Sequence, residues 1–539
     1  MDYLDRVPFF DTRSMIETGA VAVRGIDDGT ALDLRTSPLV ELYLERITLT
    51  LATRSASATE TTKTRTRILS NVTTTIAPYK LSAWMGPSGC GKTSLMSVAA
   101  GLISDPDNDL VGDSCIKIND EVGSAPKRMV GVVWQDDLLL SNLTVKETVR
   151  FAARLKNTRE VSDEEVEILV DDTLSKLGLS HIEDCLIGVP GGIGKSRGIS
   201  GGQRKRVAVA VELVARPSIL LLDEPTSGLD ASTAHQLMVT LKSLALIGHS
   251  IAVVIHQPRT SIFTMFDNLL LLSQGRVVYE GGVAGARHFL ESCGVGELPP
   301  ETGIADWIMD VIIEDEKKEG GGTLPLLWES FHSKEQQRLK DQIVIDASHN
   351  TTESRSQKLP RRLSTLEELE KEGPKYQSSF WIQLKFLTHR AAKQQRGQQL
   401  TFVAFLVTFC WTAFTCLAWG RMPDSTAYIF NRASLLFFLI IGQSNSVVST
   451  SLVTFSAESR LLSRERAKKM YRTLPYFIAV TLSDMVHSVT FPTLYGVIVY
   501  WICNLRPTAH AFFVFVLTLY LTISAAQVNF MCLPSCRHL

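Results

Sequence analysis

The sequence predicts an α/β domain followed by an all-α domain whose helices cross a membrane. In the first part, short apolar runs at residues 81–85 and 219–222 have the length of buried parallel strands, and helix-like segments follow them. In the second part, four apolar runs are each long enough to span a bilayer. Charged residues concentrate before about residue 400, so the 539-residue chain divides into two unlike parts.

A phosphate-binding loop follows the first of these strands. Residues 86–93, GPSGCGKT, match the pattern GxxxxGK[ST] in full, and residues 95–102 after them are helix-like in composition. In such a strand–loop–helix unit, backbone N–H groups hold phosphates at the N-terminus of the helix. We expect Lys92 to reach the β and γ phosphates of a nucleotide and the Thr93 hydroxyl to bind magnesium.

Two carboxylates follow the second strand. Asp223 and Glu224 come directly after residues 219–222, and open α/β sheets bind ligands at the carboxyl ends of their strands. Asp223 suits a magnesium ion, which prefers hard oxygen ligands. Glu224 can polarise a water molecule for attack on phosphorus. The alternative is a buried strand that ends in two solvated acids, and the phosphate loop upstream favours the catalytic interpretation.

The segment ISGGQ at residues 199–203 predicts a second anion site. Gly201 and Gly202 expose backbone N–H groups, Ser200 adds a hydroxyl, and a helix-like run to Ala215 follows. One nucleotide does not need two such sites from one chain. We therefore expect a composite site, in which this loop closes on a nucleotide held by a partner chain.

Together these segments resemble the ATP-binding-cassette family. Gln135, in GVVWQDD, matches the family's Q-loop, which touches magnesium and senses the membrane domain. Residues 227–230, SGLD, match the D-loop, and His256, after the predicted strand at residues 251–255, matches the switch histidine that contacts the γ phosphate. The family often stacks adenine on an aromatic residue of the first strand, but this sequence has Leu49 at the expected position, and the register of nearby Tyr43 does not fit.

The resemblance implies an α/β P-loop NTPase core with antiparallel β and helical subdomains, and ATP and Mg²⁺ as cofactors. It assigns ATP binding to Gly86, Pro87, Ser88, Gly89, Cys90, Gly91, Lys92, Thr93 and Ser94; the signature contact in trans to Ser200, Gly201, Gly202 and Gln203; catalysis to Glu224, His256 and Gln135; the D-loop to Asp230; and the metal to Thr93, Gln135 and Asp223.

The second part of the chain predicts a partial transmembrane domain, with spans at about residues 400–419, 433–455, 477–503 and 511–530. An interfacial helix at residues 379–399 precedes them. The loop between the second and third spans is rich in Lys and Arg, which places it on the cytosolic side with the ATPase domain. Within the third span Asp484 and His487 share a helix face, where a functional role and a structural pairing are both open.

An ATPase domain placed before the spans resembles the G subfamily, the white and breast-cancer-resistance type of half-transporter. That resemblance implies a homodimer or heterodimer in a lipid bilayer that exports lipophilic cargo such as lipids, sterols, pigments or drugs. The subfamily has six spans and this sequence has about four; residues 531–539, MCLPSCRHL, do not resemble a continuing helix. We expect a truncated, alternatively spliced or mispredicted product. The alternative function is a non-transporting subunit that dimerises with and regulates a full-length partner.

The remaining composition excludes some classes of protein and sets the expected domain boundaries. A net charge of −1 gives no indication of nucleic-acid binding, and four spans exclude a soluble cassette ATPase of DNA repair or translation. The N-terminus lacks a signal-peptide pattern and Cys90 lies in the phosphate loop, so we expect the ATPase domain in the reducing cytosol. The expected domains are a tail at residues 1–38, the ATPase at 39–313, a charged linker at 314–378, the interfacial helix at 379–399 and the membrane domain at 400–539.

Overall fold

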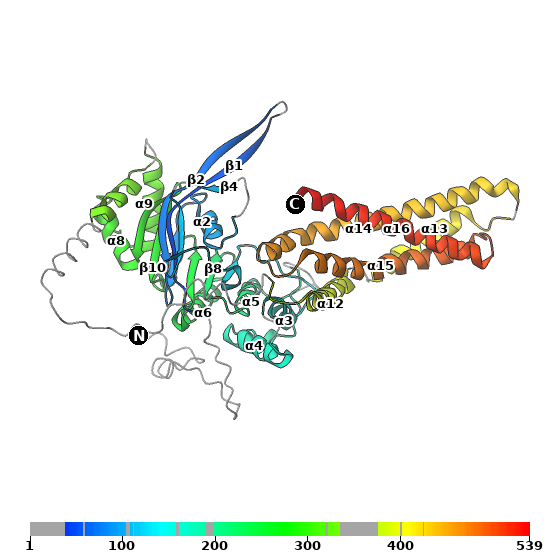
Figure 1. Cartoon of the computed structure of the whole chain (residues 1–539), viewed down its shortest axis with the longest axis horizontal. Helices are drawn as coiled ribbons and strands as arrows, with labels where there is room; N and C mark the ends of the chain where they lie inside the picture. Colours follow the sequence, from blue (N-terminus) through cyan, green and yellow to red (C-terminus); the bar gives the residue numbers. More distant parts are fainter. Residues whose placement is uncertain are drawn as a thin grey trace, which may run out of the picture.

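The computed structural model describes residues 38–57, 60–103, 108–111, 113–157, 161–189, 198–318, 322–334, 376–398, 402–423 and 425–538. Figure 1 shows an α/β body joined to an elongated bundle of helices. The predicted tail and most of the predicted linker lie outside the described residues.

The centre of the α/β body is a six-stranded sheet with the order β11-β10-β3-β9-β8-β7. All neighbouring strands are parallel except β10 and β11, which form an antiparallel hairpin. Strands β3, β7, β8 and β9 are buried along their whole length, as expected for parallel strands covered on both faces. The strands are β3 (Leu81–Met85), β7 (Val130–Val133), β8 (Ile219–Asp223), β9 (Ser250–Val254), β10 (Asn268–Ser273) and β11 (Arg276–Gly282), and the helices in this body include α2 (Lys92–Ala99), α6 (Ala231–Ile247), α7 (Thr260–Phe263), α8 (Val283–Ser292) and α9 (Ile304–Glu316).

A second, antiparallel sheet has the order β2-β1-β5-β6, with β4 paired to β1. Its strands are β1 (Leu42–Ser57), β2 (Glu60–Ile76), β4 (Asn108–Leu110), β5 (Cys115–Ile118) and β6 (Glu121–Val122). Residues 53–66 are rich in Thr, Ser and Arg, and this composition predicts a hairpin loop. That prediction is wrong, because β1 and β2 pair through the segment as far as Ser57 and Glu60. Its many threonines are β-branched and favour an extended backbone even without apolar neighbours.

A helical subdomain consists mainly of α3 (Val145–Lys156), α4 (Asp163–Lys176) and α5 (Gly201–Leu213). Each of these helices begins with a capping box, in which the first residue's hydroxyl and the side chain three residues later exchange hydrogen bonds with the backbone. Short 3₁₀ turns, η2 (Lys127–Met129) and η3 (Ser180–Ile182), complete this part of the chain.

The ATPase domain extends beyond its predicted end at residue 313. Helix α9 continues to Glu316, and residues 324–334 are helical. Leu324 and Trp328 belong to the main core, where the Trp328 ring lies 5.1 Å from that of Phe289 and 5.2 Å from that of Tyr279. The prediction that a linker begins at residue 314 is therefore wrong, because two apolar side chains anchor this charged stretch.

The elongated part contains five helices among the described residues: α12 (Phe380–Gln398), α13 (Phe402–Trp419), α14 (Ile429–Ala467), α15 (Thr473–Ile502) and α16 (Ala509–His538). A turn, η5 (Thr426–Tyr428), precedes α14. Helix α12 packs along α15, α13 also contacts α15, and α14 lies against α16 (Figure 1). Two segments, Thr426–Asn445 and Thr473–Ile502, are long and apolar enough to cross a membrane, and two shorter apolar segments are Phe405–Trp419 and Ala509–Ala525.

Two predictions for this part are wrong. The basic segment between the second and third spans was predicted to be a loop, but it is helical up to residue 467, where α14 ends. Only residues 468–472 form the turn that leads to α15. The terminal residues do continue a helix, because α16 extends to His538 through Pro534. Lys and Arg are good helix formers, so the basic C-terminal end of α14 continues the helix beyond its apolar segment.

Candidate active site

The phosphate loop connects β3 to α2, and two of its glycines are required by their surroundings. Gly86 has φ +153°, and a Cβ there would lie 2.2 Å from the carbonyl oxygen of Leu272 on β10. Gly91 has φ +103°, and a Cβ there would lie 2.6 Å from a methyl group of Leu69 on β2. The loop therefore lies close between the two sheets, in a conformation that glycine makes accessible.

Lys92 is buried at the start of α2 and its ammonium lies inside the loop. Nζ donates to the carbonyl oxygens of Gly86 at 2.7 Å and Pro87 at 2.8 Å, and it lies 3.6 Å from Sγ of Cys90. Burial raises the pKa of the Cys90 thiol, so this cysteine stays protonated beside the ammonium. The amino group is thereby held where the loop's backbone N–H groups would surround a phosphate.

Thr93 and Asp223 meet across the site. The Thr93 hydroxyl donates to Oδ2 of Asp223 at 3.1 Å, which joins the first turn of α2 to the end of β8. Asp223 is buried, and this burial raises the pKa of its carboxyl group. A hydroxyl and a carboxylate are hard oxygen donors, and Mg²⁺ commonly takes one or two protein oxygens beside water and substrate phosphates. These residues therefore fit the predicted metal, although no cluster of three His, Cys, Asp or Glu side chains occurs in the described part of the chain.

Glu224 follows β8 with an unusual backbone. Its φ is +45°, a left-handed conformation that is uncommon for a residue with a side chain. Its N–H donates to the carbonyl oxygen of Val254 at 2.9 Å, and its Oε2 accepts from Nε2 of Gln135 at 2.9 Å. The structure therefore joins Gln135, two residues after β7, to the predicted catalytic carboxylate. His256 lies two residues beyond β9 and is exposed.

The ISGGQ segment forms the N-terminus of α5. The Ser200 hydroxyl accepts from the Gln203 N–H at 3.3 Å, while Gln203 Oε1 accepts from the Ser200 N–H at 2.9 Å. A Cβ at Gly202 would lie 2.2 Å from the methyl group of Thr233 in α6. Asp230 caps α6 by accepting from the Thr233 N–H at 3.0 Å, so the D-loop and the signature loop are packed together. Ser200 and Gly201 are exposed at the start of the helix.

The two residues considered for adenine stacking, Leu49 and Tyr43, both lie in β1. Leu49 is fully buried in β1. The Lys117 ammonium lies 5.6 Å from the centre of the Tyr43 ring and covers one of its faces.

Comparison with known proteins agrees with this geometry. The sequence profile of the family described as "ABC transporter" matches residues 69–227, and that of "ABC-2 type transporter" matches residues 382–536. ABC transporter G family member 14 of Arabidopsis thaliana is 31% identical over 466 residues, which are 85% of this chain and 69% of that protein. Broad substrate specificity ATP-binding cassette transporter ABCG2 of Bos taurus is 31% identical over 522 residues, which are 94% of this chain and 77% of that protein.

The chain belongs to the G family of ABC transporters. Both domains are matched, so the predicted family and the predicted order of fold classes, an α/β ATPase before a helical membrane domain, are confirmed. Membership also shows ATP binding, ATP-dependent transport in general, and a place in a membrane. It favours transport over the alternative of a non-transporting subunit.

Sequence reasoning missed how the transporter's two domains are joined. Glu212, near the end of α5, is 8% exposed, and its carboxylate lies between two ammonium groups. Oε1 is 2.7 Å from Nζ of Lys468, in the α14–α15 turn, and Oε2 is 3.0 Å from Nζ of Lys156, at the end of α3. Burial would raise the pKa of Glu212, but the two lysines outweigh it and lower this pKa to about 2.

The same turn also contacts the strand that leads to Gln135. Nζ of Lys468 donates to the carbonyl oxygen of Val132 in β7 at 2.7 Å. Arg464, at the end of α14, donates to the carbonyl oxygen of Asp136 at 2.7 Å, and its guanidinium lies 5.5 Å from the centre of the Trp134 ring. The membrane domain is thereby bonded to residues on both sides of Gln135.

Helix α12 makes a second set of contacts. Lys393 pairs with Glu147 of α3, and Nδ2 of Asn142 donates to the carbonyl oxygen of Gln394 at 2.7 Å. Arg390 holds Glu465 of α14 with two hydrogen bonds of 2.8 and 3.0 Å. Of the two polar residues noted in the third span, Asp484 is buried and accepts from the Gln395 amide, which supports the structural pairing. The side chain of His487 lies outside what the structure describes.

Proposed function

We propose that this chain is one half of a dimeric exporter that uses ATP to move lipophilic molecules across a membrane. The observation that carries the proposal is the position of Lys468. Its ammonium binds both Val132, on the strand leading to Gln135, and Glu212, on the helix that begins with the ISGGQ loop. A change at either nucleotide-facing element is therefore mechanically connected to the turn between two membrane helices.

The chemistry that we propose is ATP hydrolysis. Lys92 and the N–H groups of its loop would hold the phosphates, while Thr93 and Asp223 would hold Mg²⁺, which neutralises phosphate charge when it is bound. Glu224 would accept a proton from the attacking water, and the Gln135 amide, 2.9 Å away, fixes the direction of that carboxylate. His256 and Ser94 complete the proposed set around the γ phosphate and the loop.

The dimer supplies the other half of each site. Residues 200–203 would contact the ATP held by residues 86–94 of the partner, with Asp230 at the junction of the two loops. A single chain offers one copy of each surface, and closed two-fold dimers are the commonest way to pair such surfaces. A second copy of this chain or a related half-transporter satisfies the same geometry.

We also propose the orientation and domain limits. The basic residues at the end of α14 lie against the ATPase domain, which agrees with a cytosolic ATPase and with the preference of Lys and Arg for the cytosolic side. With the four proposed spans, residues 400–539 form the membrane domain and residues 379–399 the interfacial helix. The proposed ATPase domain runs from residue 39 to at least residue 334. This range includes the helix at residues 324–334, which lies beyond the predicted boundary.

The test is ATP hydrolysis and dye uptake by vesicles that contain the purified chain. Glu224→Gln should retain ATP binding and lose at least about 100-fold in turnover, because the amide cannot accept the proton. Glu291→Gln, at a partly exposed carboxylate on α8 that pairs with Arg287, is the matched control and should hydrolyse ATP at the parent rate. Parent turnover in Glu224→Gln would contradict the assigned base.

Dimer formation is tested separately. With Ser88 and Ser200 both replaced by cysteine, an oxidant should crosslink two chains when ATP is present, most strongly in the Glu224→Gln background. The crosslink should fade without nucleotide, since ATP bound only by the closed dimer stabilises it. A crosslink that ignores ATP would contradict the composite site.

A further inference from the structure

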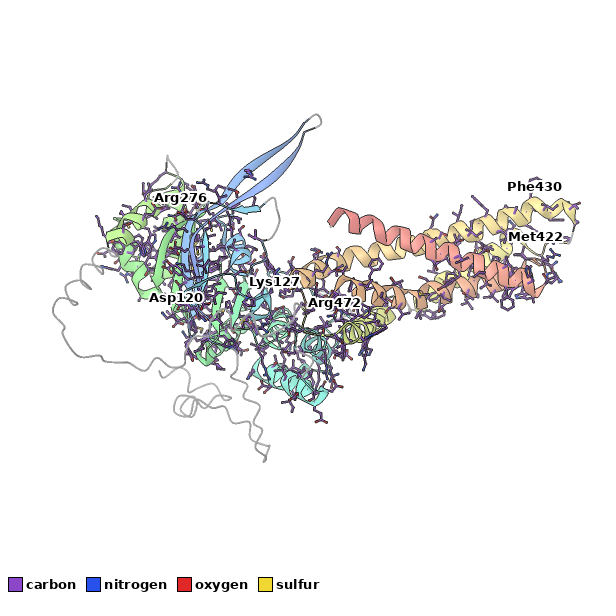
Figure 2. All side chains as sticks on the ribbon, in the orientation of Figure 1. Asp120, Lys127, Arg276, Met422, Phe430 and Arg472 are labelled. Atoms are coloured by element: carbon purple, nitrogen blue, oxygen red, sulfur yellow. The ribbon has the colours of Figure 1, made fainter. Side chains whose placement is uncertain are left out.

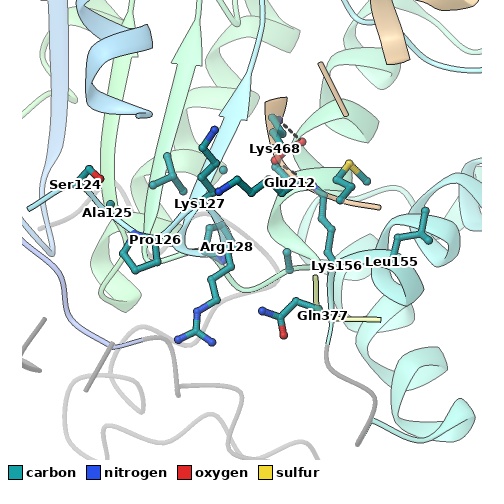
Figure 3. Close-up of a pocket in the computed structure, with 16 residues that line it drawn as sticks. Ser124, Ala125, Pro126, Lys127, Arg128, Leu155, Lys156, Glu212, Gln377 and Lys468 are labelled. Carbon is teal, nitrogen blue, oxygen red and sulfur yellow. Dashed lines mark ion pairs between the residues drawn. The ribbon is translucent and has the colours of Figure 1, made fainter. Parts of the chain in front are cut away.

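A cavity of about 540 Å³ lies between the ATPase domain and the α14–α15 turn (Figure 3). Its walls come from η2 and β7, from the ends of α3 and α5, and from residues 468–470. The proposed ATP site lies elsewhere, at residues 86–94, and no residue of that segment lines this cavity.

The charged lining of the cavity is strongly basic. Five basic side chains line it, against one carboxylate, that of Glu212; the five are Lys127, Arg128, Lys156, Lys468 and Lys469. Both oxygens of Glu212 are already engaged, one by Lys468 and one by Lys156, as the dashed lines in Figure 3 show in part. This carboxylate offsets one of the five positive charges, so the described lining of the cavity keeps a net positive charge.

Lys127, labelled in Figure 2, is one of these basic side chains. Its Nζ donates to a neutral acceptor, the carbonyl oxygen of Ala467, at 2.9 Å. Burial, and secondly the charge of Lys469, lower the pKa of Lys127. An anion bound in the cavity would be attracted by both ammonium groups, because both side chains line it.

The volume of the cavity and the types of residue that line it indicate the class of ligand. The volume is far larger than a single inorganic phosphate needs, and among the described residues no aromatic ring lines the cavity to stack a nucleotide base. Lys and Arg are the usual side chains that bind phosphate groups in proteins. The fitting ligand is a small scaffold that carries several phosphates.

We propose that this cavity binds a multiply phosphorylated small anion, the chemistry shared by soluble inositol polyphosphates and phosphoinositide headgroups. Such an anion contacts η2 of the ATPase domain and the α14–α15 turn of the membrane domain at once. It therefore strengthens the junction through which Lys468 holds Val132 and Glu212, and makes the coupling of hydrolysis to the membrane helices responsive to the ligand. This site is independent of the proposed transport activity, because binding is measured directly.

The experiment is titration calorimetry on the full chain in detergent, with inositol hexakisphosphate as the soluble probe. A Lys92→Ala background removes phosphate binding at the ATP loop. Lys127→Gln combined with Lys469→Gln should weaken the affinity about tenfold or more. Lys317→Gln combined with Lys334→Gln, two exposed lysines away from the cavity, is the matched control and should change it less than about twofold.

A second arm uses vesicles that contain a phosphatidylinositol bisphosphate, and it identifies the source of the phosphates. Binding in either arm that depends on Lys127 and Lys469 supports the site. Absence of binding in both arms, or equal weakening by the pocket and control pairs, overturns it. Substitution of the partly buried Lys127 could disturb folding, so the single variant Lys469→Glu, at an exposed residue, is tested as well. If this charge-reversal variant folds correctly and binds the probe with unchanged affinity, the proposal is overturned.

Discussion

Glu212→Gln should destabilise the protein more than the same substitution at any exposed glutamate. The substitution keeps the shape of the side chain and removes the charge that lies between Lys156 and Lys468. Breaking a buried ion pair from one side costs about 3–5 kcal/mol. The lowering of the Glu212 pKa from 4.5 to about 2 corresponds to about 3 kcal/mol in favour of the charged form, so the two magnitudes agree.

The assay is thermal unfolding of the detergent-purified chain, followed by tryptophan fluorescence. A loss of about 3 kcal/mol should lower the midpoint by about 6–12 °C for a domain of this size. Glu183→Gln is the matched control, because Glu183 is 35% exposed, lies 3.2 Å from Lys146 and is therefore much better solvated than Glu212. An ion pair in contact with solvent contributes about 1 kcal/mol or less.

A double-mutant cycle separates the ion pair from general damage. Lys468→Met alone should also destabilise. Glu212→Gln combined with Lys468→Met should recover part of the loss, because it removes one of the two ammonium groups, Lys156 and Lys468, that Glu212→Gln alone leaves without a carboxylate. If Glu212→Gln has the midpoint of the parent protein, or if the two losses are strictly additive, the pair does not stabilise the junction.

Three further outcomes are expected. Gly202→Ala should lower ATP turnover, since its Cβ would lie 2.2 Å from the methyl group of Thr233, and Thr233→Ser should restore it by removing that methyl; no rescue would contradict the steric explanation. A cysteine at exposed Ser425 should react with an impermeant reagent outside intact cells, and one at exposed Arg466 should not; the reverse would overturn the orientation. Because the Glu212 pKa is lowered by folding, its contribution is complete above pH 4.5 and should be lost as pH falls toward 2; unfolding midpoints independent of pH across that window would contradict it.

The parts that the sequence predicted well are those that local patterns determine. Strand β3 has the predicted bounds, Leu81–Met85, because five apolar residues precede a motif that specifies both a turn and a helix. The hairpin loop at residues 53–66 was predicted wrongly, since a polar composition does not distinguish a loop from an extended two-stranded ribbon. The anchoring role of Trp328 depends on Phe289 and Tyr279, which local patterns do not place beside it.

The junction was missed for a different reason. Glu212 lies between Val209 and Leu213 on the buried face of α5, and an acid on such a face is a signal that the sequence did contain. Its partner Lys468 could not be predicted, because it depends on how two domains dock. The basic residues of the α14–α15 turn were used only to orient the chain, and charge counting does not reveal that one of them is buried.

Helix α5 explains how these distant residues act together. Its 13 residues correspond to about 20 Å of rigid helix. Its N-terminus is the exposed ISGGQ loop, which would meet ATP on the partner, and Glu212 near its other end binds the α14–α15 turn. A rigid element that is fixed at both ends transmits displacement without any change in its own hydrogen bonds. In the proposed dimer, closure at Ser200 would therefore either move Lys468 with Glu212 or break a buried ion pair. Breaking the pair costs about 3–5 kcal/mol, which favours the movement of Lys468 with Glu212.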